Sequence, residues 1–572
     1  MSVQGLEAAS RPAGVGYAPP RRRPDHLVPV LDASQEFALR LMVLAWVAAS
    51  VWFWLWWTSP LRGEWNPSRI IVTGFLAWLF AMGAYYSFFI CRMTRPNPAI
   101  PVPDLRVAMV VTKAPSEPWH VVHRTLEAML GQSYPHSYDV WLADEAPSAS
   151  TLAWCEQHGV KVSSRIGVAA YHKPEWPRRT RCKEGNLAYF YDHFGYDRYD
   201  VVAQLDSDHV PATGYLAEMV RPFADPSVGY VAAPSVCDAN AAVGWTVKGR
   251  LYRDAAMHGP VQAGCNSGWA PVCIGSHYAV RTAALRDAGG IGPELAEDYT
   301  TTLWLVSRGW TGVFSIDAEA HGDGPATLDA MITQERQWSH SLGVIASRWA
   351  PSRLRAAPLR ARLRLGFSLA FYPLQAGILA AGCLVPSVAL LSGVSWGSTT
   401  LAGFYGHLWP AGLLLTAVTA YLRRSGTLRP ADAKLWSLDH TLFQLTRWPW
   451  TGWEFCKGVV GGWRRRSGAF SVTPKGDQVE AMPKPGYLFP SLALGGVPAV
   501  CVVAVPHPEQ VLGMVVVATV QSLLYLGAVL AVAVPPLVRI RPVTLALRTL
   551  WLPLVAIAGL ASLLTRLVLA AG

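Results

Sequence analysis

The sequence predicts a multi-pass α-helical membrane protein with one large α/β domain on the cytosolic side. Three observations carry this prediction. The 572 residues are 51% hydrophobic and only 15% charged, a composition typical of integral membrane proteins. Several apolar segments are about 20 residues long, the length that an α-helix needs to cross a bilayer. A long polar region between the second and third segments alternates short β-branched runs with helical patterns.

Seven apolar segments are predicted to span the membrane, and the basic residues beside them indicate the orientation. Arginines precede the first and third segments and follow the second and fourth. Under the positive-inside rule these flanks are cytosolic, which predicts a cytoplasmic (inner) membrane protein with its C-terminus outside. The predicted spans are residues 41–60, 70–91, 365–391, 401–422, 488–505, 511–534 and 545–569.

The chain is predicted to have six parts, beginning with a disordered basic N-terminus at residues 1–35. No cleavable signal peptide is expected before the first span. The other parts are an N-terminal transmembrane hairpin (36–95), the cytosolic domain (96–350), a transmembrane pair (351–429), interfacial helices and a loop (430–486) and the C-terminal transmembrane helices (487–572).

The cytosolic domain shows two periodicities in turn. Strands are expected where β-branched residues cluster, and helices where apolar residues recur every three or four positions. The predicted strands are residues 107–112, 139–143, 161–163, 201–205 and 228–232, and the predicted helices are 120–130 and 183–194.

The net charge of +11 indicates anionic partners. Because the Lys and Arg residues gather beside the apolar segments, lipid headgroups and an anionic small substrate are favoured over nucleic acid. The nine cysteines form no Cys-x-x-Cys pair and have no zinc-like spacing with histidine. Neither a disulfide framework nor a structural metal is therefore expected.

A metal site is predicted where Asp206, Asp208 and His209 follow the apolar strand 201–205. Parallel sheets hold ligands at the C-terminal ends of their strands, and hard oxygen ligands there suit a divalent cation. A solvated Asp pair in a turn is the structural alternative. The strand context and His209 favour the metal.

Two further acidic pairs are candidates for chemistry. Glu297 and Asp298 precede a helical segment, and Asp298 is the candidate base that removes a proton from an acceptor hydroxyl. A helix N-cap is the structural alternative for this pair. Asp144 and Glu145 end the strand 139–143 and suit contact with a base or ribose, or form an ordinary turn. Lys183 begins a Lys-Glu-Gly-Asn segment whose glycine permits close backbone approach.

Gln334, Gln337 and Trp338 lie at positions i, i+3 and i+4, and therefore on one helix face. A tryptophan beside two polar side chains is suited to stacking on a sugar ring, and a buried helix edge is the alternative. In the loop 470–475, an aromatic, a hydroxyl and an ammonium group could cover a base and reach phosphate oxygens.

Together these motifs resemble the processive family 2 glycosyltransferases of the bacterial cellulose synthase-like group. The resemblance rests on Gln204 to His209, Glu297-Asp298, Gln334 to Trp338 and Phe470 to Gly476, and it covers roughly residues 35–480. It implies a GT-A type domain, Mg²⁺ or Mn²⁺ as cofactor, and a UDP-sugar donor with UDP-glucose as the first candidate. The acceptor would be the growing β-linked glucan, moved across the bilayer with or without accessory export subunits.

The resemblance also implies a role for each matching residue. Asp298 and Glu297 would be catalytic, and Asp206, Asp208 and His209 would bind the metal. The acceptor would contact Gln334, Gln337, Trp338, Gly275 and Ser276, and the nucleotide would contact Thr112, Glu117, Asp144, Lys183, Asp206 and the gating-loop residues Phe470, Val472, Thr473 and Lys475.

Some positions depart from the family pattern. Gln337 stands where most relatives have an arginine, so the cation expected near the diphosphate must come from elsewhere, such as Arg336 or Lys475, or be missing. Residues 112–118 replace the usual Tyr-Asn-Glu-Pro turn, and the acceptor segment 272–277 is also altered. Nothing after Gly476 resembles a cyclic-di-GMP-binding domain.

The sequence is also compatible with other functions. The product could be a β-1,3 or mixed-linkage glucan or an amino-sugar polymer, and a non-processive enzyme could instead add one sugar to a lipid. From a different class, the chain could be an inactive scaffold or a transporter subunit of a surface-polymer complex. The three acidic residues Asp206, Asp208 and Asp298 and the scarcity of charges within the spans argue against that class.

Overall fold

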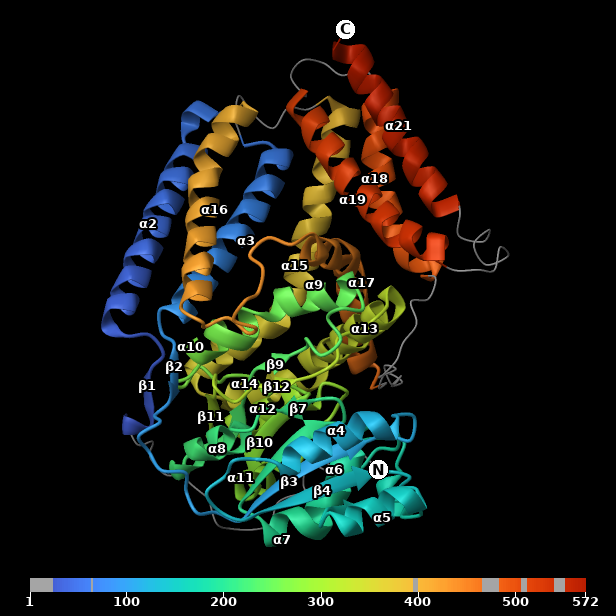
Figure 1. The fold of residues 1–572 in the computed structure, drawn as a ribbon. Helices are drawn as coiled ribbons and strands as arrows, with labels where there is room; N and C mark the ends of the chain where they lie inside the picture. The colour runs from blue at the N-terminus through green and yellow to red at the C-terminus, as the bar shows by residue number, and fades with distance from the viewer. Residues whose placement is uncertain are drawn as a thin grey trace.

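The computed structural model describes residues 24–62, 65–393, 400–465, 483–505, 512–539 and 551–571. It has two layers, with long helices above and an α/β domain below (Figure 1). The long helices are α2 (Ala33–Trp57), α3 (Pro67–Ile90), α15 (Leu359–Ser392), α16 (Leu401–Arg424), α17 (Leu438–Trp463), α18 (Pro485–Ala504), α19 (Leu512–Arg539) and α21 (Trp551–Ala571).

A seven-stranded sheet forms the centre of the α/β domain, in the order β11-β8-β10-β6-β3-β4-β5. Neighbouring strands from β6 to β5 pair in parallel, whereas β10 is antiparallel to both β6 and β8. The five predicted strands are confirmed; β10 and β11 were not predicted. The strands are β3 (Val107–Lys113), β4 (Tyr138–Asp144), β5 (Lys161–Ser163), β6 (Val201–Asp206), β8 (Val228–Ala232), β10 (His277–Arg281) and β11 (Thr311–Phe314).

Two small sheets complete the strand set. β1 (Leu27–Pro29) pairs with β2 (Thr94–Pro96), which ties together the two ends of the α2–α3 hairpin. The other sheet has the order β7-β12-β9, and it lies beside the C-terminal end of β6 because β7 follows β6 after a short turn. Its strands are β7 (Val210–Pro211), β9 (Ser235–Val236) and β12 (Ala320–His321).

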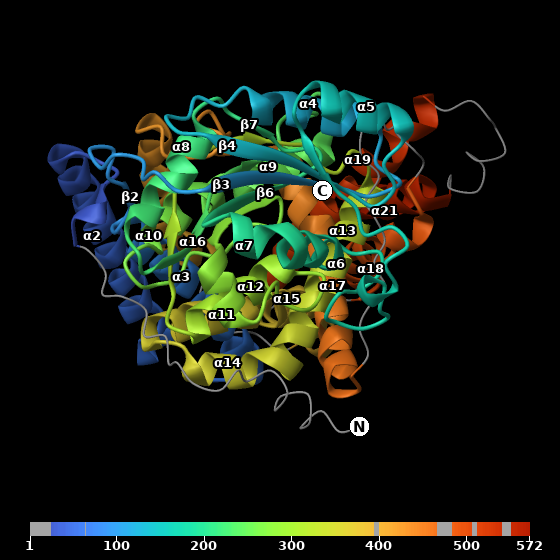
Figure 2. The ribbon, with the colours of Figure 1, turned by 90° about the horizontal axis from the view of Figure 1, so that it is seen from below.

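Helices cover both faces of the large sheet, with α4 and α5 on one side and α6, α7 and α12 on the other (Figure 2). Val107 and Val111 of β3 pack into one core, and Ala108 and Val110 pack into the other, as alternation along a strand requires. The domain helices are α4 (Trp119–Leu130), α5 (Ala149–Gln157), α6 (Lys183–Phe190), α7 (Tyr196–Arg198), α8 (Tyr215–Val220), α9 (Trp245–Asp254), α10 (Gln262–Gly264), α11 (Thr282–Ala288), α12 (Glu297–Ser307), α13 (Leu328–Val344) and α14 (Ala350–Ala356).

Six helices in the described part of the chain are long and apolar enough to cross a membrane. They are α2, α15, α16 and α18 and the segments 69–90 of α3 and 512–534 of α19. The seventh predicted span falls in α21, whose described apolar stretch is Pro553–Leu563. The protein is therefore a multi-pass membrane protein.

Helix α17 links the two layers. It is as long as the spans but carries charged residues, and it packs closely against α13 of the α/β domain. A Cβ at Gly343 would lie 2.2 Å from the Phe455 carbonyl oxygen, and one at Gly458 would lie 2.1 Å from that of His340. These two glycines let the backbones touch, which fixes α13 against the membrane layer.

Candidate active site

An acidic cluster lies at the C-terminal end of β6. Asp206 is the last residue of this strand, and Asp208 and His209 occupy the turn that leads into β7. One ligand atom from each of the three side chains lies within 4.8 Å of the others, and the last two are buried. Two carboxylates and an imidazole form a donor set that fits Mg²⁺ or Mn²⁺. The structure thus brings together the three predicted metal ligands.

The buried His209 is held by its neighbours. Burial opposes a charge on the ring, but the Asp208 carboxylate 3.4 Å away raises the pKa of His209 to about 9, so a divalent cation that binds this ring must displace a proton. Its Nε2 atom lies 3.0 Å from the Ser235 hydroxyl. Only a glycine fits beside this ring, because a Cβ at Gly322 would lie 2.4 Å from it.

Lys183, the first residue of α6, connects the acidic groups. Its Nζ atom donates to Asp206 Oδ1 at 2.7 Å and to the Gly275 carbonyl oxygen, and it lies 3.6 Å from Glu297 Oε1. One ammonium group therefore contacts the predicted metal site, the acceptor segment and the catalytic pair. The sequence predicted a nucleotide contact for Lys183 but not this central position.

Glu297 and Asp298 begin α12, and both side chains are buried. The residue at the N-cap is Ala296, without a side-chain cap, so capping does not explain the pair. Burial raises the pKa of Glu297 to about 8 and that of Asp298 to about 6. A Cβ at Gly275 would lie 3.1 Å from Asp298 Oδ2, so the glycine lets the acceptor segment reach this carboxylate.

The predicted nucleotide residues lie at the ends of β3 and β4. The Thr112 hydroxyl faces the Leu205 carbonyl oxygen at 3.5 Å, and Glu117 Oε2 accepts from the Ala114 amide at 2.7 Å. Asp144 is completely buried, with one carboxylate oxygen 3.2 Å from Lys113 Nζ. Lys113 was missed in the sequence because its partner lies on the neighbouring strand.

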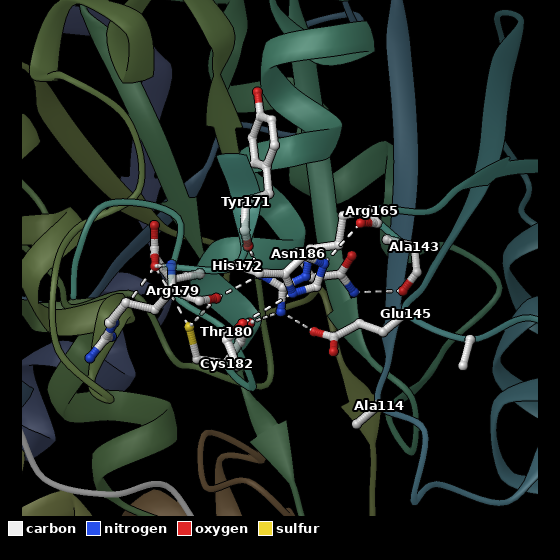
Figure 3. A network of polar contacts seen from close by, with 12 residues as sticks. Ala114, Ala143, Glu145, Arg165, Tyr171, His172, Arg179, Thr180, Cys182 and Asn186 are labelled. Carbon is white, nitrogen blue, oxygen red and sulfur yellow. Dashed lines mark hydrogen bonds and ion pairs between the residues drawn. The ribbon is translucent and has the colours of Figure 1, made fainter. Parts of the chain in front are cut away.

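A buried arginine organises the loop between β5 and α6 (Figure 3). Arg165 is fully buried and donates to the carbonyl oxygens of Tyr171 and Arg179 at 2.9 and 2.6 Å. Its other terminal nitrogen pairs with Glu145, next to Asp144 at the end of β4. Asn186 of α6 donates to the Ala143 carbonyl oxygen at 2.8 Å. These bonds fix α6, and with it Lys183, against β4.

The predicted acceptor residues form two groups. Ser276 lies beside the metal site, since its carbonyl oxygen accepts from the Asp206 amide at 2.7 Å and its hydroxyl donates to Ser235 at 2.9 Å. Gln334 and Trp338 are on α13, where Gln334 accepts from Arg250 at 2.7 Å and Trp338 packs against the core under the sheet.

The remaining predicted site residues are Gln337 and the gating-loop residues. Gln337 is half-buried on the same helix, α13. Phe470, Val472, Thr473 and Lys475 of the predicted gating loop lie outside the described residues.

Comparison with known proteins identifies the domain. Residues 103–341 match the family described as glycosyltransferase like family 2. This part of the chain is a glycosyltransferase family 2 domain of the GT-A type, which confirms the predicted fold class.

Solved structures of glycosyltransferases show a weak likeness to the chain. The mannosyltransferase PcManGT of Pyrobaculum calidifontis, in complex with GDP-Man and Mn²⁺, has 17% identity and a TM-score of 0.45 over 70% of this chain and 100% of that one. Glucosyl-3-phosphoglycerate synthase of Mycobacterium tuberculosis, with Mn²⁺, UDP and its product, has 18% identity and a TM-score of 0.28 over 42% of this chain and 79% of that one. Because these TM-scores are below 0.5, the donor and acceptor of these enzymes are not assigned to this chain.

Proposed function

We propose that this protein is an inverting glycosyltransferase that polymerises a UDP-sugar, with UDP-glucose as the first candidate, into a β-linked glucan. The polymer leaves the cytosol through the protein's own transmembrane helices. The observation that carries the proposal is the contact of Lys183 with both Asp206 and Glu297, which unites the predicted metal site and the predicted catalytic pair.

In the proposed reaction, the acceptor hydroxyl oxygen attacks the anomeric carbon of the donor sugar. The bond from that carbon to the diphosphate breaks, and the hydroxyl proton passes to Asp298. A divalent cation held by Asp206, Asp208 and His209 would neutralise charge on the departing UDP. Lys183 adds a positive charge at the same place. At neutral pH Glu297 keeps its own proton, because burial raises its pKa to about 8, so Asp298 is the carboxylate that can accept one.

A cavity of about 240 Å³ between α15, α17 and α19 supports the export part of the proposal. Aromatic rings and amides line it, surfaces on which sugar rings can stack and hydrogen-bond. One lining residue, Arg447, pairs with Glu335 beside Gln334 at 2.6 Å, and Tyr372 packs against the same core as Trp338. The cavity is lined by Phe371, Tyr372, Gln375, Leu379, Gln444, Leu445, Arg447, Trp448, Thr451 and Tyr525.

The proposal is tested by incubating the purified protein with radiolabelled UDP-glucose, UDP-N-acetylglucosamine or GDP-mannose and with Mg²⁺ or Mn²⁺. We expect a polymer from UDP-glucose that a β-1,4-glucanase degrades. Degradation by a β-1,3-glucanase alone would change the linkage and keep the proposed class. A single sugar transferred to lipid, with no polymer, would contradict the proposal.

Replacing Trp338 with alanine is expected to shorten the polymer. A processive enzyme has to hold the terminal sugar while UDP leaves, and stacking on an aromatic ring contributes on the order of 1 kcal/mol. The measurement is the length distribution of radiolabelled product on a sizing column, together with UDP affinity. We expect Trp338→Ala to give shorter chains at unchanged UDP affinity.

Trp453→Ala is the matched control, because Trp453 lies on the neighbouring α17 with 62% of its surface exposed. Its product length should equal that of the wild type. Equal lengths for Trp338→Ala and the wild type would show that Trp338 only packs against the core.

A further inference from the structure

A partly buried chain of charges connects α9, α13 and α17, which meet where the α/β domain faces the membrane helices (Figure 1). Arg253 of α9 pairs with Asp254 at 2.7 Å and with Glu335 of α13 at 2.6 Å. Glu335 also pairs with Arg447 of α17 at 2.6 Å. Arg250 completes the chain, 3.7 Å from Asp254. Three guanidinium groups therefore share two carboxylates.

Arg250 is the least well paired of the three arginines. Its only ion pair in the described part of the chain is the 3.7 Å contact with Asp254, whose carboxylate accepts two shorter hydrogen bonds from Arg253. The Arg250 Nε atom is buried without a hydrogen-bond partner among the described residues. A half-buried cation whose nearest carboxylate is 3.7 Å away and shared with a second arginine is incompletely neutralised, and an anionic ligand would relieve that cost.

Arg250 lies between Gln334 of α13 and the predicted metal site. On one side its Nη1 atom donates to Gln334 Oε1 at 2.7 Å. Burial acts to raise the pKa of the Cys237 thiol, but the nearby positive charges of Arg250 and His209 lower it. Ser235 lies within 4.0 Å of that thiol and 3.0 Å from His209. The guanidinium thus lies one side chain away from the predicted metal ligands.

The position where relatives carry an arginine holds Gln337, and the adjacent Arg336 is already committed. Arg336 donates to Glu454 Oε1 at 3.0 and 2.6 Å, on the side of α13 that faces α17. It is therefore not available to a ligand near Asp208. Arg250 of α9 is a half-buried guanidinium that contacts Gln334, the first residue of the Gln334 to Trp338 motif on α13.

We propose that Arg250 binds the diphosphate group of the nucleotide donor and of the nucleoside diphosphate that leaves. This assignment rests on the proposed function and adds a residue to its donor site. A guanidinium suits this role because its parallel N–H groups match two phosphate oxygens. Bound phosphate would supply the negative charge that this partly buried chain of three arginines and two carboxylates lacks.

The test measures the affinity of UDP, with Mn²⁺ present, for the full-length protein in detergent. We expect Arg250→Gln to weaken UDP binding by at least about 10-fold, the loss expected for a hydrogen bond to a charged group. Uridine, which has no phosphate, should bind the variant and the wild type equally. Lys248→Gln is the matched control, a half-buried cation on the same helix, and should leave UDP affinity unchanged.

The outcomes separate this inference from the proposed function. A wild-type protein that binds no nucleoside diphosphate would overturn both. Tight UDP binding by the wild type and equally tight binding by Arg250→Gln would overturn only the role of Arg250. If Arg250→Gln does not fold, Arg250→Lys keeps the charge and should still weaken UDP binding several-fold while uridine binding holds; unchanged UDP affinity there would overturn the inference.

Discussion

Replacing Asp208 with asparagine is expected to abolish sugar transfer. The change removes one of two carboxylates from the cluster whose ligand atoms lie within 4.8 Å, and an amide is a poorer ligand for a hard cation. Because a bound divalent ion contributes several kcal/mol to stabilising a departing diphosphate, the rate should fall at least about 100-fold. The measurement is incorporation of radiolabelled sugar at saturating UDP-glucose, with Mn²⁺ binding to the protein followed separately.

The matched control for Asp208→Asn lies at the other end of the same strand. Asp200 immediately precedes β6 and pairs with Arg106 at 2.7 Å on the surface, where a salt bridge contributes little. Asp200→Asn should keep its activity and its Mn²⁺ affinity. Wild-type transfer by a folded Asp208→Asn variant would remove Asp208 from the metal site and leave the proposed chemistry without a cation.

Much of the fold could be predicted because the relevant patterns are local. β-branched runs placed β3, β4 and β6 correctly, and an apolar length of about 20 residues identified the membrane helices. The strand β10 was missed because it begins at His277, the last residue of the altered acceptor segment 272–277, which was interpreted as a functional motif. Its place in the sheet depends on antiparallel pairing with β6, and nothing within five residues signals such a partner.

The candidate site divides in the same way. Asp206, Asp208 and His209 are adjacent in sequence, so their cluster could be predicted from one motif and one strand. The contacts around these three residues could not be predicted, because they join residues that are far apart in the sequence. Arg250 meets Gln334 across 84 residues, and Arg165 meets Glu145 across 20 residues that include α5 and β5. Arginines are common on protein surfaces, and only the contacts of these two, together with the full burial of Arg165, distinguish them.

The exposure of α17 also shows what patterns miss. The segment 430–486 was predicted to contain interfacial helices because it has many tryptophans and basic residues and is too polar to span the membrane. In the structure, Trp453 and Trp463 of α17 are exposed, but Arg447 and Glu454 are buried in ion pairs with α13. These two charged residues of α17 therefore bind the α/β domain rather than facing water. Charge alone cannot tell these two roles apart.

Replacing Asp298 with asparagine is expected to stop transfer while nucleotide binding survives. A positioned general base contributes about 10²- to 10⁴-fold to the rate, and an amide cannot accept the acceptor proton. UDP affinity should hold because the base acts on the acceptor. Glu297→Gln is the comparison, since an amide resembles the protonated carboxyl that Glu297 carries below its pKa of about 8. It should cost much less activity than Asp298→Asn at pH 7.

The pH dependence of wild-type activity is expected to follow the protonation of the Asp298 carboxyl. Burial raises the pKa of Asp298 to about 6, so the base is protonated and idle below that pH. Activity should fall about tenfold per pH unit below 6 and level off above it. A raised pKa also means that this carboxyl costs stability as the pH rises, so Asp298→Asn should melt no lower than the wild type at pH 7. If a folded Asp298→Asn variant transfers sugar at the wild-type rate and its activity falls below pH 6 as in the wild type, a different group is the general base.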